Sequence, residues 1–237
     1  MAKEKQKKSI FETPLLSTKI KSANAKLFPE ALLGYLVGPT LAMLANSILS
    51  TYLNKYMTDI LGLTGESTAL FLTLLPIISV VFVIIGNILV GRLMDRNKTK
   101  AGKARPLILL SIPLSVVALL VLFVFLPFST DGNIWTLALL AIGYNLWFAI
   151  AYPFYYTSHA ALVNLSTRSS KDRGLLATVS NATILAAMGI SSMFLPFFIG
   201  LLFTGNAESS YNNWKIFAIA LAIITAIGPI IEYYLTW

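Results

Sequence analysis

The chain has 237 residues, of which 57% are hydrophobic and 12% are charged. In an ordinary soluble domain about a quarter of the residues are charged. A single domain of this length has too small a core to bury so many apolar side chains away from water. The composition therefore excludes a water-soluble globule and predicts a protein embedded in lipid. Because the chain has no cysteine and a single histidine, disulfides are excluded, we expect no metal site, and an enzyme is disfavoured.

A basic segment precedes the first apolar run and begins with the residues MAKEKQKK. It lacks a small-residue cleavage site, so we expect no signal peptide. We interpret residues 1–27 as a cytoplasmic tail that sets the topology of the chain. Binding of this tail to anionic lipid is the alternative.

Long uncharged runs follow the tail, and a bilayer core needs about 20 apolar residues per helix. We therefore predict an all-α membrane protein with a bundle of six transmembrane helices at 28–237. The run at 132–167 is too short for two spans and a turn, so it is predicted to form one helix bent at Pro153. Lys215 and Glu232 are expected at the two ends of the last span, reaching to the interfaces. The predicted spans are about 28–58, 67–92, 106–128, 134–165, 175–204 and 214–236.

The net charge of +8 first suggests a nucleic-acid partner, but the positions of the basic residues indicate otherwise. Of the 18 Lys and Arg residues, 16 lie in the first 26 residues, in 92–105 or in 168–173. Pairs of spans separate these segments, so all of them can share one face of the membrane. The positive-inside rule makes that face cytoplasmic and places both termini there. We therefore expect no nucleic-acid partner.

Polar side chains form a stripe along the first span. Asn46, Ser50 and Asn54 recur every four residues, and Ser47, Thr51 and Lys55 flank them at the same spacing. In lipid such a face must contact protein or water. Hydrogen bonding between helices and a water-filled, solute-binding cavity are equal alternatives.

The fourth span carries aromatic hydroxyls and amides near Pro153. These residues fall mainly on one face of the predicted helix, and they are Asn145, Tyr152, Tyr155, Tyr156 and His159. Such groups suit stacking and hydrogen bonding to a sugar-like solute, and they also suit ordinary aromatic packing. His159 is a candidate for proton coupling because imidazole titrates near neutrality; a hydrogen-bonded core residue is the alternative.

The third and fifth spans differ in character. The third is apolar all round, so we expect it to face lipid. The fifth has a thin polar face with Thr178, Asn181 and Ser192. It also has small residues around Gly189, which predict close helix packing.

The boundary between the second and third spans, residues 91–106, reads GRLMDRNKTKAGKARP. This G-x-x-x-D-R-x-x-x-K-x-G-K-x-R-P string resembles the loop between helices two and three of major facilitator transporters. It is most similar to that of the glycoside–pentoside–hexuronide:cation symporters, the melibiose permease family. Two further segments resemble that family: YLNKYMTDILGL at 52–63, and YPFY at 152–155 followed by KDR at 171–173.

The resemblance covers about residues 34–237 and implies a particular architecture. The chain would be the N-terminal six-helix bundle of a twelve-helix major facilitator fold, with its solute bound between two halves. The missing partner would be a C-terminal six-helix half or a second copy of the chain. The resemblance also implies a conformational latch in the basic loop, formed by Gly91, Asp95, Arg96, Gly102 and Arg105. Charge that only sets topology is the other interpretation of this loop.

The sequence departs from the family where the family binds its ligands. Aligned on these motifs, the family's cation- and sugar-binding carboxylates fall at Met43, Val83, Asn87 and Ala151, and its sugar-binding arginine falls at Asn181. None of these positions is charged, and Val83 and Ala151 offer no side-chain oxygen to Na⁺. Asn87 and Asn181 remain polar and suit a neutral, hydroxyl-rich solute.

We therefore expect a secondary active transporter, or its N-terminal half, in the cell membrane, moving a sugar, a glycoside or a similar polar solute. No cofactor is expected, and the coupling ion is H⁺ or Na⁺. The expected substrate-binding residues are Asn46, Ser50, Asn54, Tyr152, Tyr155, His159 and Asn181. The alternative is a non-transporting membrane partner or a lipid-binding half-bundle.

Overall fold

A computed structural model describes residues 27–128, 133–167 and 169–236 of the chain. The predicted basic tail therefore lies almost wholly outside the described residues. Within them the chain forms helices and no strand, and six helical segments are long and apolar enough to cross a membrane. The prediction of an all-α protein with six membrane spans is confirmed.

Several spans are composed of more than one helical segment, with π-helical turns marked η. The first span joins η2 (Leu27–Val37), α1 (Gly38–Lys55) and η3 (Tyr56–Ile60), and the second is α2 (Glu66–Arg96). The third joins α3 (Arg105–Leu119) and η4 (Leu120–Val124). The fourth joins α4 (Ile134–Asn145), η5 (Leu146–Ala151) and α5 (Tyr152–Leu165). The fifth is α6 (Ser170–Leu202), and the sixth is α7 (Ala207–Leu235), which begins well before the predicted residue 214.

Local chemistry defines where these helices begin. The side chains of Asn133, Ser169 and Asn206 accept hydrogen bonds from backbone N–H groups in the first turns of α4, α6 and α7. Such caps satisfy donors that have no partner within the helix. Gly102 and Gly205 have φ angles of +94° and +79° in the connections before α3 and α7. These angles favour glycine because it has no Cβ.

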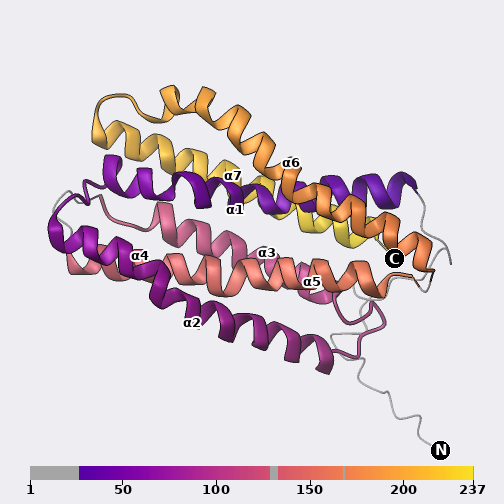
Figure 1. The fold of residues 1–237 in the computed structure, drawn as a ribbon. Helices are drawn as coiled ribbons and strands as arrows, with labels where there is room; N and C mark the ends of the chain where they lie inside the picture. Colours follow the sequence, from indigo (N-terminus) through magenta and orange to yellow (C-terminus); the bar gives the residue numbers. More distant parts are fainter. Residues whose placement is uncertain (1–26, 129–132, 168, 237) are drawn as a thin grey trace, which may run out of the picture.

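The spans run up and down, so that alternate connections share one end of the bundle. The start of η2, the α2–α3 connection, the start of α6 and the C-terminal end of α7 all lie at the right-hand end in Figure 1. The basic segments at 92–105 and at the start of α6 therefore share one end. That this end is cytoplasmic remains a prediction.

Glycines bring the backbones of neighbouring spans into direct contact. A Cβ added to Gly228 of α7 would lie 2.5 Å from the Ala42 nitrogen and from the Gly38 oxygen of α1. A Cβ on Gly86 of α2 would lie 1.8 Å from the Ala149 oxygen of η5. Because small residues permit such close crossings in membranes, these positions fix the α1–α7 and α2–η5 pairs.

Two expectations about the surroundings of the third and fifth spans require correction. The third span does not simply face lipid, because α3 packs between α5 and α7 and buries Ile108, Ser111 and Ala118. The small residues of α6 do not all serve packing, since Gly189 has no neighbouring atom within 4 Å of an added Cβ. The apolar residues of the third span could not show its surroundings, because an apolar surface suits lipid and another apolar helix equally well.

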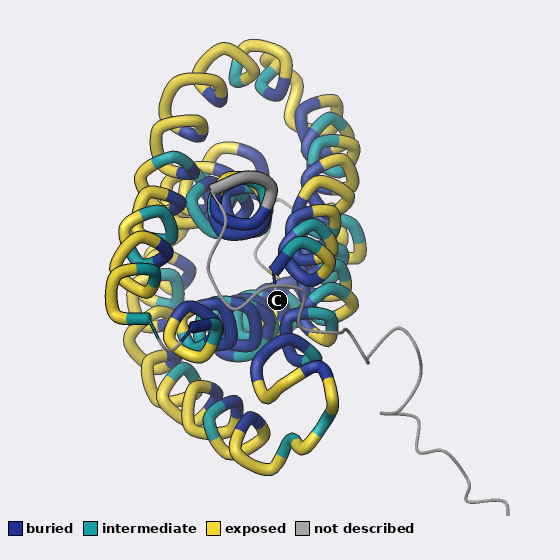
Figure 2. Tube along the Cα trace, turned by 90° about the vertical axis from the view of Figure 1, so that its right-hand side faces the viewer, coloured by how far each residue is buried: buried dark blue, intermediate teal, exposed yellow. Residues whose placement is uncertain are grey.

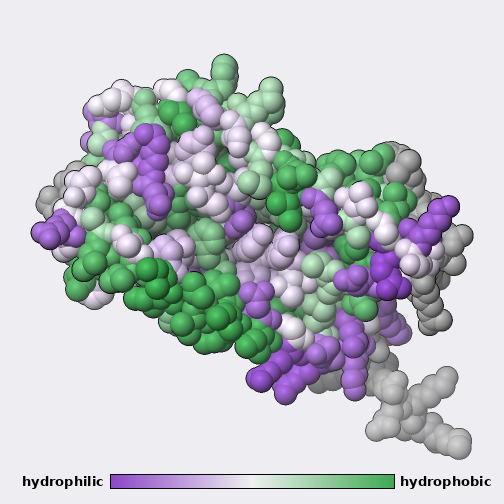
Figure 3. Space-filling model, viewed as in Figure 1, coloured by the Kyte–Doolittle hydropathy of each residue, from purple (hydrophilic) through white to green (hydrophobic). Residues whose placement is uncertain are grey.

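The exposed surface is apolar along the bundle and charged at one end. The tube in Figure 2 shows buried residues toward the inside of the bundle and exposed residues on its outside. In Figure 3, hydrophobic side chains cover α2, where Ile77, Val81 and Ile85 are among the exposed residues, while hydrophilic side chains gather near its C-terminal end. This distribution suits a segment that lies in a bilayer with a basic end in water.

Candidate functional site

Part of the predicted polar stripe lines a cavity between the first, fourth and fifth spans. The cavity has a volume of about 140 Å³. Asn46, Ser50 and Tyr152 are in its wall, and Tyr152 stacks on Tyr156 with ring centroids 5.4 Å apart. Asn54, also predicted to bind solute, is exposed and is not among the residues that line this cavity.

A hydrogen bond across the cavity wall joins α1 to η5. Asn46 Oδ1 accepts from Trp147 Nε1 at 3.2 Å, and the indole of Trp147 is buried. The Ser50 hydroxyl donates to the backbone oxygen of Asn46 within α1. Asn46 therefore bonds to a neighbouring helix and also lines the cavity. Solute binding at this stripe remains a prediction.

A second cavity, of about 190 Å³, lies beside the first. His159 and Asn181, both predicted to bind solute, line it together with Ser180. Met43 and Ile184 line both cavities, which are therefore neighbours. The structure thus brings the polar residues of spans one, four and five around one hollow region.

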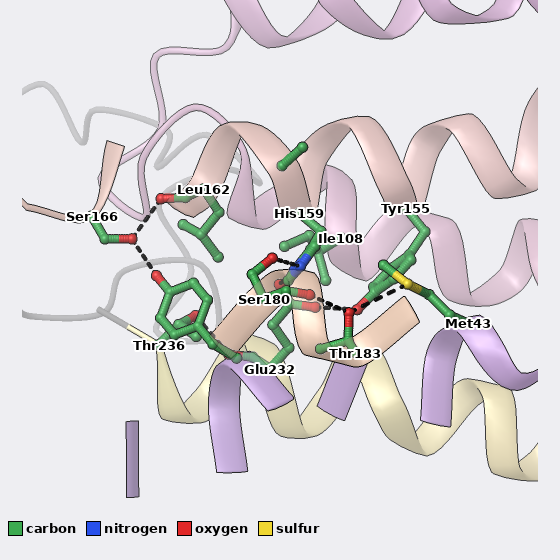
Figure 4. Close-up of polar contacts among 12 residues, drawn as sticks. Met43, Ile108, Tyr155, His159, Leu162, Ser166, Ser180, Thr183, Glu232 and Thr236 are labelled. Carbon is green, nitrogen blue, oxygen red and sulfur yellow. Dashed lines mark hydrogen bonds and ion pairs between the residues drawn. The ribbon is translucent and has the colours of Figure 1, made fainter. Parts of the chain in front are cut away.

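Behind the second cavity lies a buried polar cluster that is missing from the sequence predictions. The Tyr155 hydroxyl donates to Glu232 Oε2, and His159 Nδ1 lies 2.6 Å from Glu232 Oε1. On its other side, His159 Nε2 lies 2.6 Å from Ser180 Oγ. Figure 4 shows these side chains converging from α5, α6 and α7.

The prediction that Glu232 reaches to the membrane interface is wrong. Its side chain is 0% exposed and points into the bundle toward Tyr155 and His159. The sequence offered one signal, a carboxylate within an apolar run, which marks a functional site by default. Its partners were not evident because they lie more than 70 positions away in the sequence.

The basic loop predicted to form a latch divides into exposed and buried parts. The Asp95 side chain is 84% exposed and lies 3.9 Å from Lys103 Nζ, and Arg96 is also exposed. The loop folds on itself, since the Asn97 side-chain amide donates to the Lys103 oxygen and the Thr99 hydroxyl donates to the Gly102 oxygen. Gly91, near the end of α2, has open space around it.

Arg105, the last residue of this motif, lies within the bundle. It is 6% exposed, and its guanidinium donates to the backbone oxygen of Tyr233 in α7. The guanidinium also lies over the Tyr233 ring, 4.7 Å from the ring centroid. These contacts join the start of α3 to the end of α7.

The positions aligned with the family's ligand-binding carboxylates do not form a charged site. Asn87 of α2 accepts a hydrogen bond from the Thr157 hydroxyl of α5 at 2.9 Å. Met43 is buried, and the Thr183 hydroxyl contacts its sulfur. Among the described residues, no group of three or more His, Cys, Asp or Glu side chains is placed to hold a metal ion.

Six membrane-length helices with polar cavities between three of them define a multi-pass membrane protein with a polar interior. The family model for "MFS/sugar transport protein" matches residues 34–237, and the chain belongs to that family. The family of transporters expected from the sequence motifs is thereby confirmed.

Curated relatives agree with this assignment. The chain is 23% identical over 195 residues to an uncharacterized symporter of Bacillus subtilis (strain 168), YnaJ, covering 82% of this chain and 40% of the relative. It is 26% identical over 192 residues to a lactose permease of Lactobacillus helveticus, covering 76% and 30%. It is 23% identical over 217 residues to a glucuronide carrier protein homolog of Escherichia coli (strain K12), covering 90% and 43%. The chain thus spans less than half the length of these relatives.

Proposed function

We propose that the chain forms the N-terminal six-helix half of a secondary active transporter in the cell membrane. The observation that carries the proposal is the hollow lined by Asn46, Tyr152 and Asn181 on three different spans. Amides and aromatic hydroxyls at this spacing suit a neutral solute with many hydroxyl groups. The curated relatives named as a lactose permease and a glucuronide carrier support a sugar or glycoside as that solute.

The other side of the solute site would come from a second helical half. In transporters built from repeats the solute lies between the halves. A C-terminal six-helix bundle or a second copy of this chain would supply the facing residues. The exposed Asp95 and Arg96 are placed to contact such a half, whereas Arg105 is committed to α7.

Binding of lactose and of a phenyl glucuronide tests the proposal, measured in lipid nanodiscs on the protein encoded by the whole reading frame that includes this chain. Asn181→Ala removes a cavity amide, and Asn212→Ala is its matched control, because Asn212 is exposed on α7 and lines neither cavity. Loss of one solute hydrogen bond is expected to weaken binding about three- to tenfold. Asn212→Ala is expected to bind like the parent chain.

Uptake of labelled lactose into vesicles, measured for the reading frame that includes this chain, extends the test to transport. Saturable binding that is weakened only in the Asn181 variant supports the solute site. Absence of saturable binding for both glycosides contradicts it. That outcome would favour the alternative of a non-transporting membrane partner or a lipid-binding half-bundle.

A further inference from the structure

A carboxylate and the single imidazole of the chain lie together inside the bundle, against the cavity between α5 and α6. Glu232 is fully buried and His159 is 2% exposed. Replacement of a buried ion pair by apolar side chains of similar volume often leaves stability unchanged or raises it. Stability alone therefore does not explain the pair, and ionisable groups within membrane helices are expected to serve function.

The hydrogen bonds around this pair determine which atom can exchange a proton. An ionised carboxylate only accepts hydrogen bonds. When Glu232 is ionised, the Tyr155 hydroxyl donates to Oε2, and His159 Nδ1, next to Oε1, must carry the imidazole proton. A neutral imidazole with its proton on Nδ1 has Nε2 as its basic atom. The neighbour of Nε2, at 2.6 Å, is Ser180 Oγ.

Ser180 suits both protonation states of His159. A serine hydroxyl can donate to neutral Nε2 or accept from the N–H of an imidazolium. His159 and Ser180 both line the cavity of about 190 Å³, next to Asn181. The Nε2 side of the imidazole is thus connected to the cavity, while Glu232 holds the opposite nitrogen (Figure 4).

Other titratable groups among the described residues lie around the pair. They are Glu30 and Tyr35 of η2, Arg105 of α3, Tyr152 and Tyr155 of α5, and Tyr233 of α7. Nearby α6 has no ionisable residue between Arg173 and its end at Leu202, and in α1 only Tyr52 and Lys55 are ionisable.

We propose that His159 Nε2 binds the coupling proton of this protein, held by Glu232 and exchanged with the cavity through Ser180. A hydronium ion in the cavity gives up one proton and is left as water. The proton adds to Nε2 directly, or it binds Ser180 Oγ while the hydroxyl proton of Ser180 passes to Nε2, so that the serine hydroxyl is restored. The product is an imidazolium, and release follows the same path in reverse. The inference rests on the proposed transport function and names its coupling ion and the residues that carry it.

Occupancy of the cavity and protonation of His159 are linked in this arrangement. A solute that bonds to Asn181 lies next to Ser180 and alters the hydrogen bond that Ser180 makes with Nε2. Linkage is reciprocal, so a proton that changes solute affinity is itself bound differently when solute is present. The smallest typical coupling is about fivefold in affinity.

Nitrogen NMR of the histidine tests the proton site directly. Because the chain has one histidine, ¹⁵N-histidine labelling gives a single imidazole, provided that the purification tag contains none. In nanodiscs, the signals are expected to change from a neutral to an imidazolium pattern as the pH is lowered from 9 to 5. Glu232→Gln is expected to change this pH response, because the carboxylate beside Nδ1 is lost. Glu208→Gln, the same substitution at an exposed position of α7, is expected to leave it unchanged.

Lactose affinity of the protein from the whole reading frame, measured at pH 5.5 and pH 8, tests the linkage. The lactose affinity of the parent protein is expected to change about fivefold between the two pH values, and that of Glu208→Gln is expected to change equally. The affinity of Glu232→Gln is expected to be the same at both pH values. An imidazole that keeps one protonation state from pH 5 to 9 in the parent chain overturns the proposal, even if Glu232→Gln does not fold. Titration of His159 without any lactose binding would instead contradict the transport function and leave the proton site standing.

Discussion

Arg105 shows how one side chain of a loop motif can act inside the fold. Its position in the basic string resembles a latch residue, yet its guanidinium contacts the backbone oxygen and the ring of Tyr233. A charged donor to a carbonyl contributes about 1.5–3 kcal/mol, and stacking on an aromatic ring adds to that. We therefore infer that Arg105 stabilises the α3–α7 contact.

Substitution of Arg105 by alanine is expected to lower the free energy of unfolding by about 2 kcal/mol, because both contacts with Tyr233 are lost. Arg96→Ala provides the control, since Arg96 is exposed in the same loop motif. Thermal unfolding of the purified chain in detergent measures both variants. Equal stability of the two would show that Arg105 has no structural role within the bundle and would favour a latch.

At the scale of the helices, glycine positions determine which spans approach most closely. Gly38 and Gly228 allow the backbones of α1 and α7 to touch, and Gly86 does the same for α2 and η5. Asn46 of α1 and Trp147 of η5, which are hydrogen-bonded to each other, each lie on an element that a glycine brings close to another span.

The variant Gly228→Ala is expected to destabilise the bundle by about 1–3 kcal/mol, because the new Cβ would lie 2.5 Å from backbone atoms of α1. Gly189→Ala is the matched control in α6, where an added Cβ meets open space. It is expected to be neutral or to stabilise its helix by about 0.5–1 kcal/mol. A chemical denaturation series of both proteins gives the comparison, and similar losses in both would refute close packing at Gly228.

On the scale of the whole molecule, polar residues line a hollow among three spans, the surface along α2 is apolar, and hydrophilic side chains gather near the C-terminal end of α2. Ser50 and Asn181 line the hollow, whereas Ile85 is among the exposed apolar residues of α2. The α2–α3 connection and the α6–α7 connection lie at opposite ends of the bundle (Figure 1). Water is therefore expected at the two ends and in the hollow.

Single cysteines test this arrangement cleanly because the natural chain has none. Ser50→Cys and Asn181→Cys are expected to react with a water-soluble maleimide, while Ile85→Cys in the bilayer reacts far more slowly. Equal reaction at all three positions would contradict a hydrated hollow.

The orientation in the membrane is tested separately with Lys98→Cys and Ser209→Cys in intact cells. A membrane-impermeant maleimide is expected to label only the Ser209 variant, because the basic end is predicted to be cytoplasmic. Labelling of the Lys98 variant alone would reverse the topology.

The sequence alone determined the solvent, the number of spans and the family. The solvent follows from composition, because so large an apolar fraction cannot be buried away from water within one domain of this length. The number of spans follows from residue order, because charged residues separate the apolar runs at the membrane surfaces. The family follows from the sequence motifs. Asn46, Tyr152, His159 and Asn181 were also identified from helical spacing, and the structure places all four in cavity walls.

Only the tertiary structure decided how distant residues combine. Glu232 looked like the end of a span until packing placed it against His159 and Tyr155, more than 70 residues earlier. The contact of Arg105 with Tyr233 of α7 likewise became evident only from the packing. Helical periodicity reports which residues share a face, but it carries no information about which face of another helix lies opposite. The contacts that create the buried cluster arise only when α5, α6 and α7 pack together.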